Sequence, residues 1–131
     1  MTLSYFGQLD VLVNNAGYGY AGAIEESEEY TLRKMFETTF WGVSNMTRAV
    51  LSHLRGVRSG RILNVTSICG LTSVPTFGYY NSTKFAVEDL MDALRQEVSP
   101  LGIQITNIDP GPFQADWSGR SMSGSEILIP D

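Results

Sequence analysis

Ser67, Tyr80 and Lys84 have the side-chain types and the spacing that proton transfer requires. Tyr80 and Lys84 are four residues apart in a predicted helix, which places their side chains on one helix face. A free tyrosine ionises near pH ~10, and a fixed positive charge beside the phenol lowers that pKa. We therefore expect Lys84 to lower the pKa of Tyr80. If the intervening loop folds back, the Ser67 hydroxyl meets the phenol over one substrate oxygen, which suits the interconversion of a carbonyl and an alcohol.

The strands that must position these side chains are short apolar runs followed by polar residues. Leu9–Val13 is typical of a buried strand that ends at Asn14, and Ile62–Val65 predicts a strand that ends just before Ser67. Ile103–Ile108 predicts a further strand, and an Asp-Pro-Gly turn follows it.

Helical patterns separate these strands. Apolar residues at three- and four-residue steps predict a helix over Glu28–Leu54, with Ser27 as its N-cap. A second stripe runs from Val87 to Val98 and stops at Pro100. Strands that alternate with helices imply right-handed crossovers and a parallel sheet, with ligands at the carboxyl ends of the strands.

These residues resemble the motifs of the short-chain dehydrogenase/reductase family. The match runs from about Leu9 to Gly124. The resemblance implies an α/β fold, a partial Rossmann-like, doubly wound parallel sheet with flanking helices. Four motifs stand in the family's order: Asn14-Asn15-Ala16-Gly17, Phe40-Trp41-Gly42, Ser67 thirteen residues before Tyr80-x-x-x-Lys84, and Pro110-Gly111.

Two of the catalytic candidates have a neighbour of the same kind. Tyr79 is five residues from Lys84 and points away from its helix face, which favours Tyr80. The family's spacing of thirteen residues selects Ser67 over Thr66. Taken singly, these side chains are typical of a strand-end hydroxyl, a helix-start aromatic and a solvated charge. Taken together, they favour a catalytic group.

The resemblance implies an NAD(P)(H)-dependent oxidoreductase that transfers hydride between nicotinamide and a carbonyl or alcohol substrate. Tyr80 would be the general acid and base, Ser67 would orient the substrate oxygen, and Lys84 would also contact the ribose. The cofactor, NADP or NAD, would lie against residues that follow the first and last strands. These residues are Asn15, Ala16, Gly17, Pro110, Gly111 and Phe113.

Two positions depart from the family pattern. Thr39 stands where the family has the Asn of its catalytic group, whose carbonyl holds a water behind the lysine. A threonine hydroxyl can still donate and accept, but it is shorter, and simple packing on the helix face is an equally good interpretation. Ala115 replaces a Ser or Thr, so we expect no hydrogen bond from this side chain to the carboxamide.

Gly17-Tyr-Gly-Tyr-Ala-Gly22 formally matches the dinucleotide fingerprint G-x-G-x-x-G. That fingerprint requires its third glycine to open a helix whose positive end meets a pyrophosphate. The residues that follow Gly22 include four acids within seven positions, which would repel phosphate. We therefore reject the match.

Composition indicates a single globular domain. The chain has 131 residues, of which 43% are hydrophobic and 18% charged. Short apolar runs and the absence of signal-peptide features predict a cytoplasmic location and no membrane partner. A net charge of −5 without a basic block argues against nucleic acid. With Cys69 and His53 the sole residues of their types, we expect neither a disulfide nor a metal site.

We interpret residues 9–111 as the core, 1–8 as an extension, and 112–131 as a tail resembling the family's substrate lid. We find no family glycine-rich turn, no strand that selects between NAD and NADP, and no final strand. We therefore expect a partial domain whose Leu9–Val13 strand has an open apolar edge. The full-length form is expected to be a homo-oligomer acting on a small carbonyl or alcohol. The alternative is a truncated, inactive chain that acts only through protein association.

Overall fold

A three-stranded parallel sheet forms the centre of the computed structural model, which describes residues 2–112 and 122–125. Its strands are β1 (Val11–Asn14), β3 (Gly60–Val65) and β4 (Ile103–Ile108), in the order β1-β3-β4. The prediction of a parallel sheet is confirmed, and β4 has the predicted bounds. β1 begins later than predicted and includes Asn14, because Asn14 is paired in register with Asn64 of β3.

The two faces of this sheet have different surroundings. Leu12, Ile62 and Ile105 align across the strands and are 8%, 0% and 6% exposed. Val11 and Val13 project from the other face of β1 and are 46% and 55% exposed. β1 has β3 as its one neighbour among the described strands, as the prediction of an open apolar edge requires.

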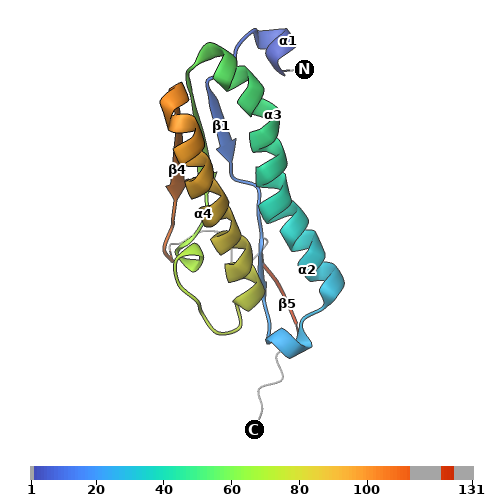
Figure 1. Ribbon diagram of the computed structural model, residues 1–131. Helices are drawn as coiled ribbons and strands as arrows, with labels where there is room; N and C mark the ends of the chain where they lie inside the picture. The colour runs from blue at the N-terminus through green and yellow to red at the C-terminus, as the bar shows by residue number, and fades with distance from the viewer. Residues whose placement is uncertain (1, 113–121, 126–131) are drawn as a thin grey trace.

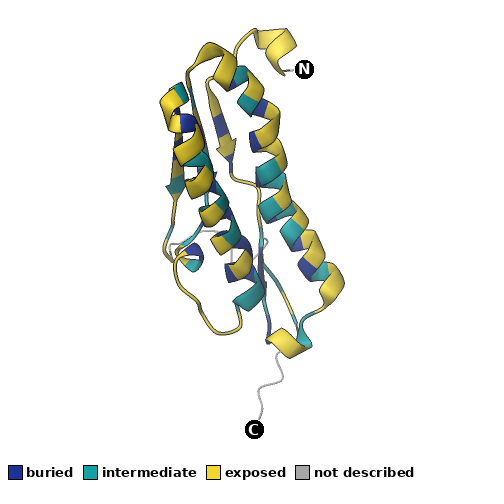
Figure 2. Ribbon diagram, in the orientation of Figure 1, coloured by how far each residue is buried: buried dark blue, intermediate teal, exposed yellow. Residues whose placement is uncertain are grey.

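Two long helical segments cover the buried face of the sheet and lie side by side (Figure 1). The first consists of α2 (Glu29–Phe36), a π-helical turn η2 (Glu37–Trp41) and α3 (Gly42–Val57), and the second is α4 (Gly78–Val98). Buried residues form a stripe along each segment, and exposed residues occupy the outer side (Figure 2). The amphipathic periodicity thus decides which side of each helix meets the sheet.

The prediction of one uninterrupted helix over Glu28–Leu54 is wrong in detail. The π turn η2 adds a residue to one turn, which a pattern of three- and four-residue steps does not reveal. The helix also continues to Val57 and ends where Arg58 adopts a left-handed conformation with φ 53°. Ser27 is not the N-cap of α2, because its Oγ donates to the Ala23 carbonyl at 2.7 Å instead.

Short elements connect these layers. Helix α1 (Thr2–Phe6) precedes β1, and three 3₁₀ turns follow in order along the chain: η1 (Ile24–Glu26), η3 (Ile68–Gly70) and η4 (Ser99–Leu101). η4 is followed by Gly102, whose φ of 79° turns the chain into β4.

A second, two-stranded sheet joins distant parts of the sequence. β2 (Gly19–Ala21) pairs in parallel with β5 (Met122–Gly124). β2 also occupies the middle of the G-x-G-x-x-G match, and the residues after Gly22 form no α-helix before Glu29. The rejection of that match as a phosphate-binding fingerprint is therefore confirmed by the local backbone.

Apolar side chains pack in two clusters. The larger lies between the sheet and the two helices and includes Leu54, Ile62 and Met91, each 0% exposed. The smaller gathers Tyr20, Leu32, Met35 and Tyr80 near the amino end of α4. Tyr80 thus belongs to the core as well as to the candidate site. Among the described helices, none combines the length and the apolar character that a membrane span requires.

Candidate active site

The structure brings Ser67, Tyr80 and Lys84 together at the carboxyl edge of the sheet. Ser67 is the N-cap of η3, directly beyond β3, while Tyr80 and Lys84 lie in the first two turns of α4. A side-chain hydrogen bond joins Ser67 and Tyr80, and the Lys84 Nζ lies 5.6 Å from the centroid of the Tyr80 ring. The predicted convergence of a hydroxyl, a phenol and an amine is confirmed.

Local backbone bonds hold Ser67 in place. Its Oγ accepts from the Cys69 N–H at 3.1 Å, as an N-cap side chain does. The Ile68 N–H donates to the Pro110 carbonyl at 3.1 Å, so the turn after β3 is attached to the turn after β4. Both turns therefore stay at the same edge of the sheet.

Lys84 is a buried amine, 7% exposed, whose Nζ donates to the Val65 carbonyl at 3.1 Å. Burial disfavours its charged form and lowers its pKa from 10.5 to about 8, although the neighbouring Cys69 and Glu88 raise it. The amine therefore remains mostly charged at neutral pH.

The expectation that Lys84 lowers the pKa of Tyr80 is wrong for this structure. Burial raises the pKa of the Tyr80 phenol above its usual value of 10.0; the hydrogen bond with Ser67 lowers it and the nearby Cys69 raises it. Desolvation outweighs these other contributions because Tyr80 is 5% exposed. The phenol is thus held in its protonated form, ready to donate.

Thr39 completes the group on the side of β1. It lies in the π turn η2 and is 2% exposed, and its Oγ1 has no hydrogen-bond partner within the described residues. A Cβ placed on Gly17 would lie 3.6 Å from this oxygen and 3.9 Å from the Lys84 Nζ. Thr39 and Lys84 therefore face the same space beside Gly17, and an unsatisfied buried hydroxyl there calls for a polar ligand or water.

The predicted cofactor contacts fall at the two ends of this edge. Asn15, Ala16 and Gly17 follow β1 and are exposed, while Pro110 and Gly111 follow β4. An exposed glycine next to an orphaned hydroxyl fits the close approach of a nucleotide, so the residues present suit a dinucleotide. Phe113 and Ala115 lie outside the described residues.

Sequence reasoning missed a polar network beneath the site. Asn14, Asn64 and Asn107 occupy the same register position in β1, β3 and β4 and bond side chain to side chain. Glu88 on α4 accepts from the last of these amides at 2.6 Å. An asparagine near the carboxyl end of each predicted strand was the available signal, because β propensity disfavours this residue there.

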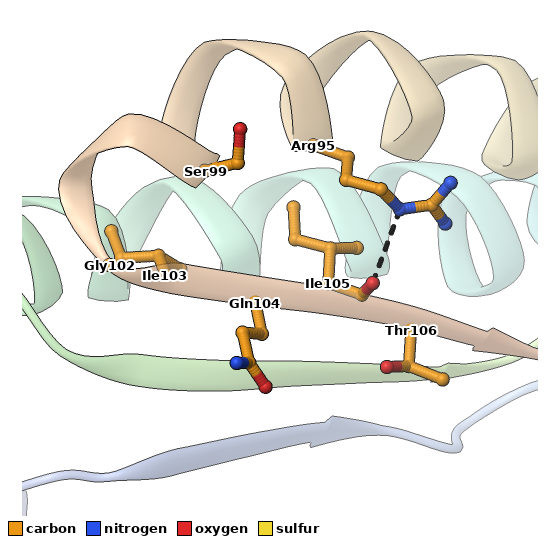
Figure 3. Close-up of a pocket in the computed structure, with 7 residues that line it drawn as sticks. All are labelled: Arg95, Ser99, Gly102, Ile103, Gln104, Ile105 and Thr106. Carbon is orange, nitrogen blue, oxygen red and sulfur yellow. Dashed lines mark hydrogen bonds between the residues drawn. The ribbon is translucent and has the colours of Figure 1, made fainter.

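A hollow of about 440 Å³ lies elsewhere, between the end of α4 and the outer edge of β4 (Figure 3). Its wall includes Arg95, whose Nε donates to the Ile105 carbonyl at 3.2 Å. None of the candidate catalytic residues borders it. The chemistry is therefore assigned by side-chain convergence and not by this hollow.

A parallel α/β sheet with Ser67, Tyr80 and Lys84 at its carboxyl edge defines a Rossmann-like fold with a candidate catalytic group. The family profile described as short chain dehydrogenase matches residues 2–125. The chain belongs to this family, as its sequence motifs predicted.

Individual relatives agree with this assignment. The chain is 41% identical over 116 residues to a 3-ketodihydrosphingosine reductase of Bacteroides thetaiotaomicron, covering 88% of this chain and 43% of the relative. A solved short-chain dehydrogenase from Streptomyces avermitilis superposes with a TM-score of 0.92 at 38% identity, over 98% of this chain and 48% of that one. The structure of ElxO with NADP bound superposes with a TM-score of 0.81 at 37% identity, and the match covers 83% of this chain and 44% of ElxO. The chain thus spans less than half the length of these relatives.

Proposed function

We propose that the protein is an NAD(P)(H)-dependent oxidoreductase that interconverts a small-molecule carbonyl and its alcohol. The observation that carries this proposal is the convergence of the Ser67 hydroxyl, the Tyr80 phenol and the Lys84 amine at one sheet edge. Membership of the short chain dehydrogenase family and the NADP bound to the similar ElxO support it.

Each of the three side chains has a distinct role in this proposal. The Tyr80 phenol donates its proton to the carbonyl oxygen during reduction and takes a proton back during oxidation. The Ser67 hydroxyl, already bonded to the phenol, polarises the same oxygen. The Lys84 amine, whose Nζ lies 5.6 Å from the centroid of the Tyr80 ring, holds the cofactor ribose beside the phenol.

The backbone beside these groups holds the cofactor. Asn15, Ala16 and Gly17 line one side, Pro110 and Gly111 the other, and Lys84 reaches a ribose hydroxyl. Nicotinamide, when bound, supplies or accepts the hydride. Thr39 and Lys84 border the space beside Gly17, where a water or sugar hydroxyl would satisfy the unpartnered Thr39 Oγ1.

Titration of the 131-residue chain with NADPH and with NADH tests cofactor binding. The proposal predicts saturable binding, measured as a change in the fluorescence of the reduced nicotinamide. Absence of binding to both would refute the proposal for this chain and favour the alternative of a non-catalytic chain that acts through protein association.

Tyr80→Phe tests the catalytic assignment. In the protein that carries this sequence, the rate of carbonyl reduction should fall about 10²–10⁴-fold, the usual contribution of a general acid. Tyr79→Phe is the matched control, since Tyr79 is the adjacent phenol and packs on the smaller core cluster. A rate near wild type for Tyr80→Phe, measured as loss of NADPH absorbance, would contradict the assignment.

A further inference from the structure

Glu88 lies one helical turn after Lys84 on α4 and takes no part in the proton transfer proposed above. A directed chain of amides ends on it. Asn14 Nδ2 donates to Asn64 Oδ1 at 2.8 Å, Asn64 Nδ2 to Asn107 Oδ1 at 3.0 Å, and Asn107 Nδ2 to Glu88 Oε2 at 2.6 Å. Asn64 and Asn107 each accept with the amide oxygen and donate with the amide nitrogen, so every link points its N–H toward Glu88.

The second oxygen of Glu88 lacks such a donor. Oε1 is buried without a hydrogen-bond partner in the described part of the chain, and the carboxyl group contacts that of Asp109. Thr66 lies beside both acids and its hydroxyl hydrogen-bonds to each, but it has a single proton for the two. Two touching carboxyl groups with too few donors are satisfied when one of them carries a proton.

Glu88 and Asp109 lie where helix α4 meets the turn that follows β4. Asp109 immediately precedes Pro110 and Gly111, and the Pro110 carbonyl accepts from the Ile68 N–H at 3.1 Å. Glu88 belongs to the helix that carries Tyr80 and Lys84. The contact between Glu88 and Asp109 therefore joins the catalytic helix to the turn after β4.

We propose that Glu88 and Asp109 share one proton, and that this carboxyl–carboxylate pair holds the Pro110-Gly111 turn against α4. The inference rests on the proposed function, in which this turn borders the cofactor. Glu88 is thus a positioning residue: it sets where the turn lies and touches no reacting atom. Loss of the shared proton leaves two carboxylates that repel each other, so the turn separates from α4 and cofactor binding weakens.

The surroundings of Glu88 set the direction of its pH response. Its titratable neighbours are Asp109, at the end of β4, and Lys84, on its own helix. Burial raises the pKa of Glu88 and the contact with Asp109 raises it further, while the hydrogen bonds with Thr66 and Asn107 lower it, so that the pKa stays above its usual value. The stability that this group contributes is therefore complete below the pKa of an unfolded glutamate and is lost as pH rises through the folded pKa.

Glu88→Gln mimics the protonated acid, because its amide N–H can donate to Asp109 at every pH. As pH rises above the usual range of a glutamate, wild type should lose thermal stability by an amount that E88Q does not lose. The midpoint temperature of thermal unfolding of E88Q should therefore rise relative to that of wild type as pH increases. Glu97→Gln, an exposed acid on the same helix, is the matched control and should follow wild type.

Asp109→Asn places the amide on Asp109 and leaves Glu88 unchanged. The test therefore does not depend on whether E88Q folds well. It should show the same loss of pH dependence, because either amide replaces the shared proton. Glu88→Ala removes the hydrogen bond altogether, so it should weaken NADPH binding at all pH values, whereas E88Q should restore it. Equal pH dependence of stability in wild type, E88Q and D109N would overturn the proposal.

The two proposals fail in different ways. If wild type shows the predicted pH-dependent stability but binds neither NADPH nor NADH, the shared proton stands and the proposed function falls. If wild type binds NADPH, its dissociation constant should rise with pH while that of E88Q stays level. Parallel pH profiles for the two proteins would overturn the role of Glu88 and leave the function intact.

Discussion

Lys84→Met tests whether the structure has buried the amine as deeply as its surroundings indicate. Lys84 is 7% exposed, and burial lowers its pKa from 10.5 to about 8. Between these two values the unfolded chain holds the lysine proton and the folded chain has released it. Unfolding therefore takes up a proton, and the stability of wild type rises with pH relative to the methionine variant.

The size of this stability difference follows from the pKa shift of Lys84. A difference of about 2.5 units between 10.5 and about 8 corresponds to roughly 3 kcal/mol over the whole titration. Between about pH 7 and about pH 9.5 the linkage relation gives a gain of about 2 kcal/mol for wild type over Lys84→Met. Tyr80 is present in both proteins, so its direct contribution largely cancels in the comparison.

The assay is urea unfolding of both proteins across this pH range, followed by circular dichroism. Methionine keeps most of the length of the side chain and removes the charge, although the bond to the Val65 carbonyl is lost at every pH. Lys34→Met, at an exposed position, controls for loss of a lysine. A difference in stability between wild type and Lys84→Met that stays constant within about 0.5 kcal/mol would refute the burial argument.

Glycine positions yield two further predictions. Gly17→Ala should leave stability within about 0.5 kcal/mol of wild type, since the added Cβ lies at ordinary contact distances of 3.6 Å and more. It should nevertheless weaken NADPH binding, measured by fluorescence titration, because the methyl group fills the space faced by Thr39 and Lys84; unchanged affinity would contradict the cofactor assignment. Gly102→Ala should destabilise the fold by about 3 kcal/mol in urea unfolding, because φ is 79° and the Cβ would lie 2.4 Å from the Arg58 carbonyl oxygen. Gly56→Ala, with nothing within 4 Å of the added Cβ, is its control and should stabilise α3 by about 0.5–1 kcal/mol; equal effects at the two glycines would contradict the argument.

Much of the fold was accessible from local pattern. The alternating segment Ile103–Ile108 is too short for a helix and is bounded by Gly102 and a Pro-Gly turn, so its bounds were predicted correctly. The π turn at Glu37–Trp41 was not predicted, because one extra residue in a turn leaves the apolar periodicity nearly unchanged. The pairing of β2 with β5 joins residues about a hundred positions apart, and no short-range signal encodes it.

The sequence by itself determined which residues are candidates for the chemistry: a four-residue spacing fixes Tyr80 and Lys84 on one helix face, whatever surrounds them. Only the tertiary structure decided the electrostatics of these groups. The direction of a pKa shift depends on how much water is removed and which groups close in, and burial raised the pKa of Tyr80 where a neighbouring charge alone would have lowered it. The contact between Glu88 and Asp109 likewise arises from the packing of α4 on β4, and no spacing rule in the sequence encodes it.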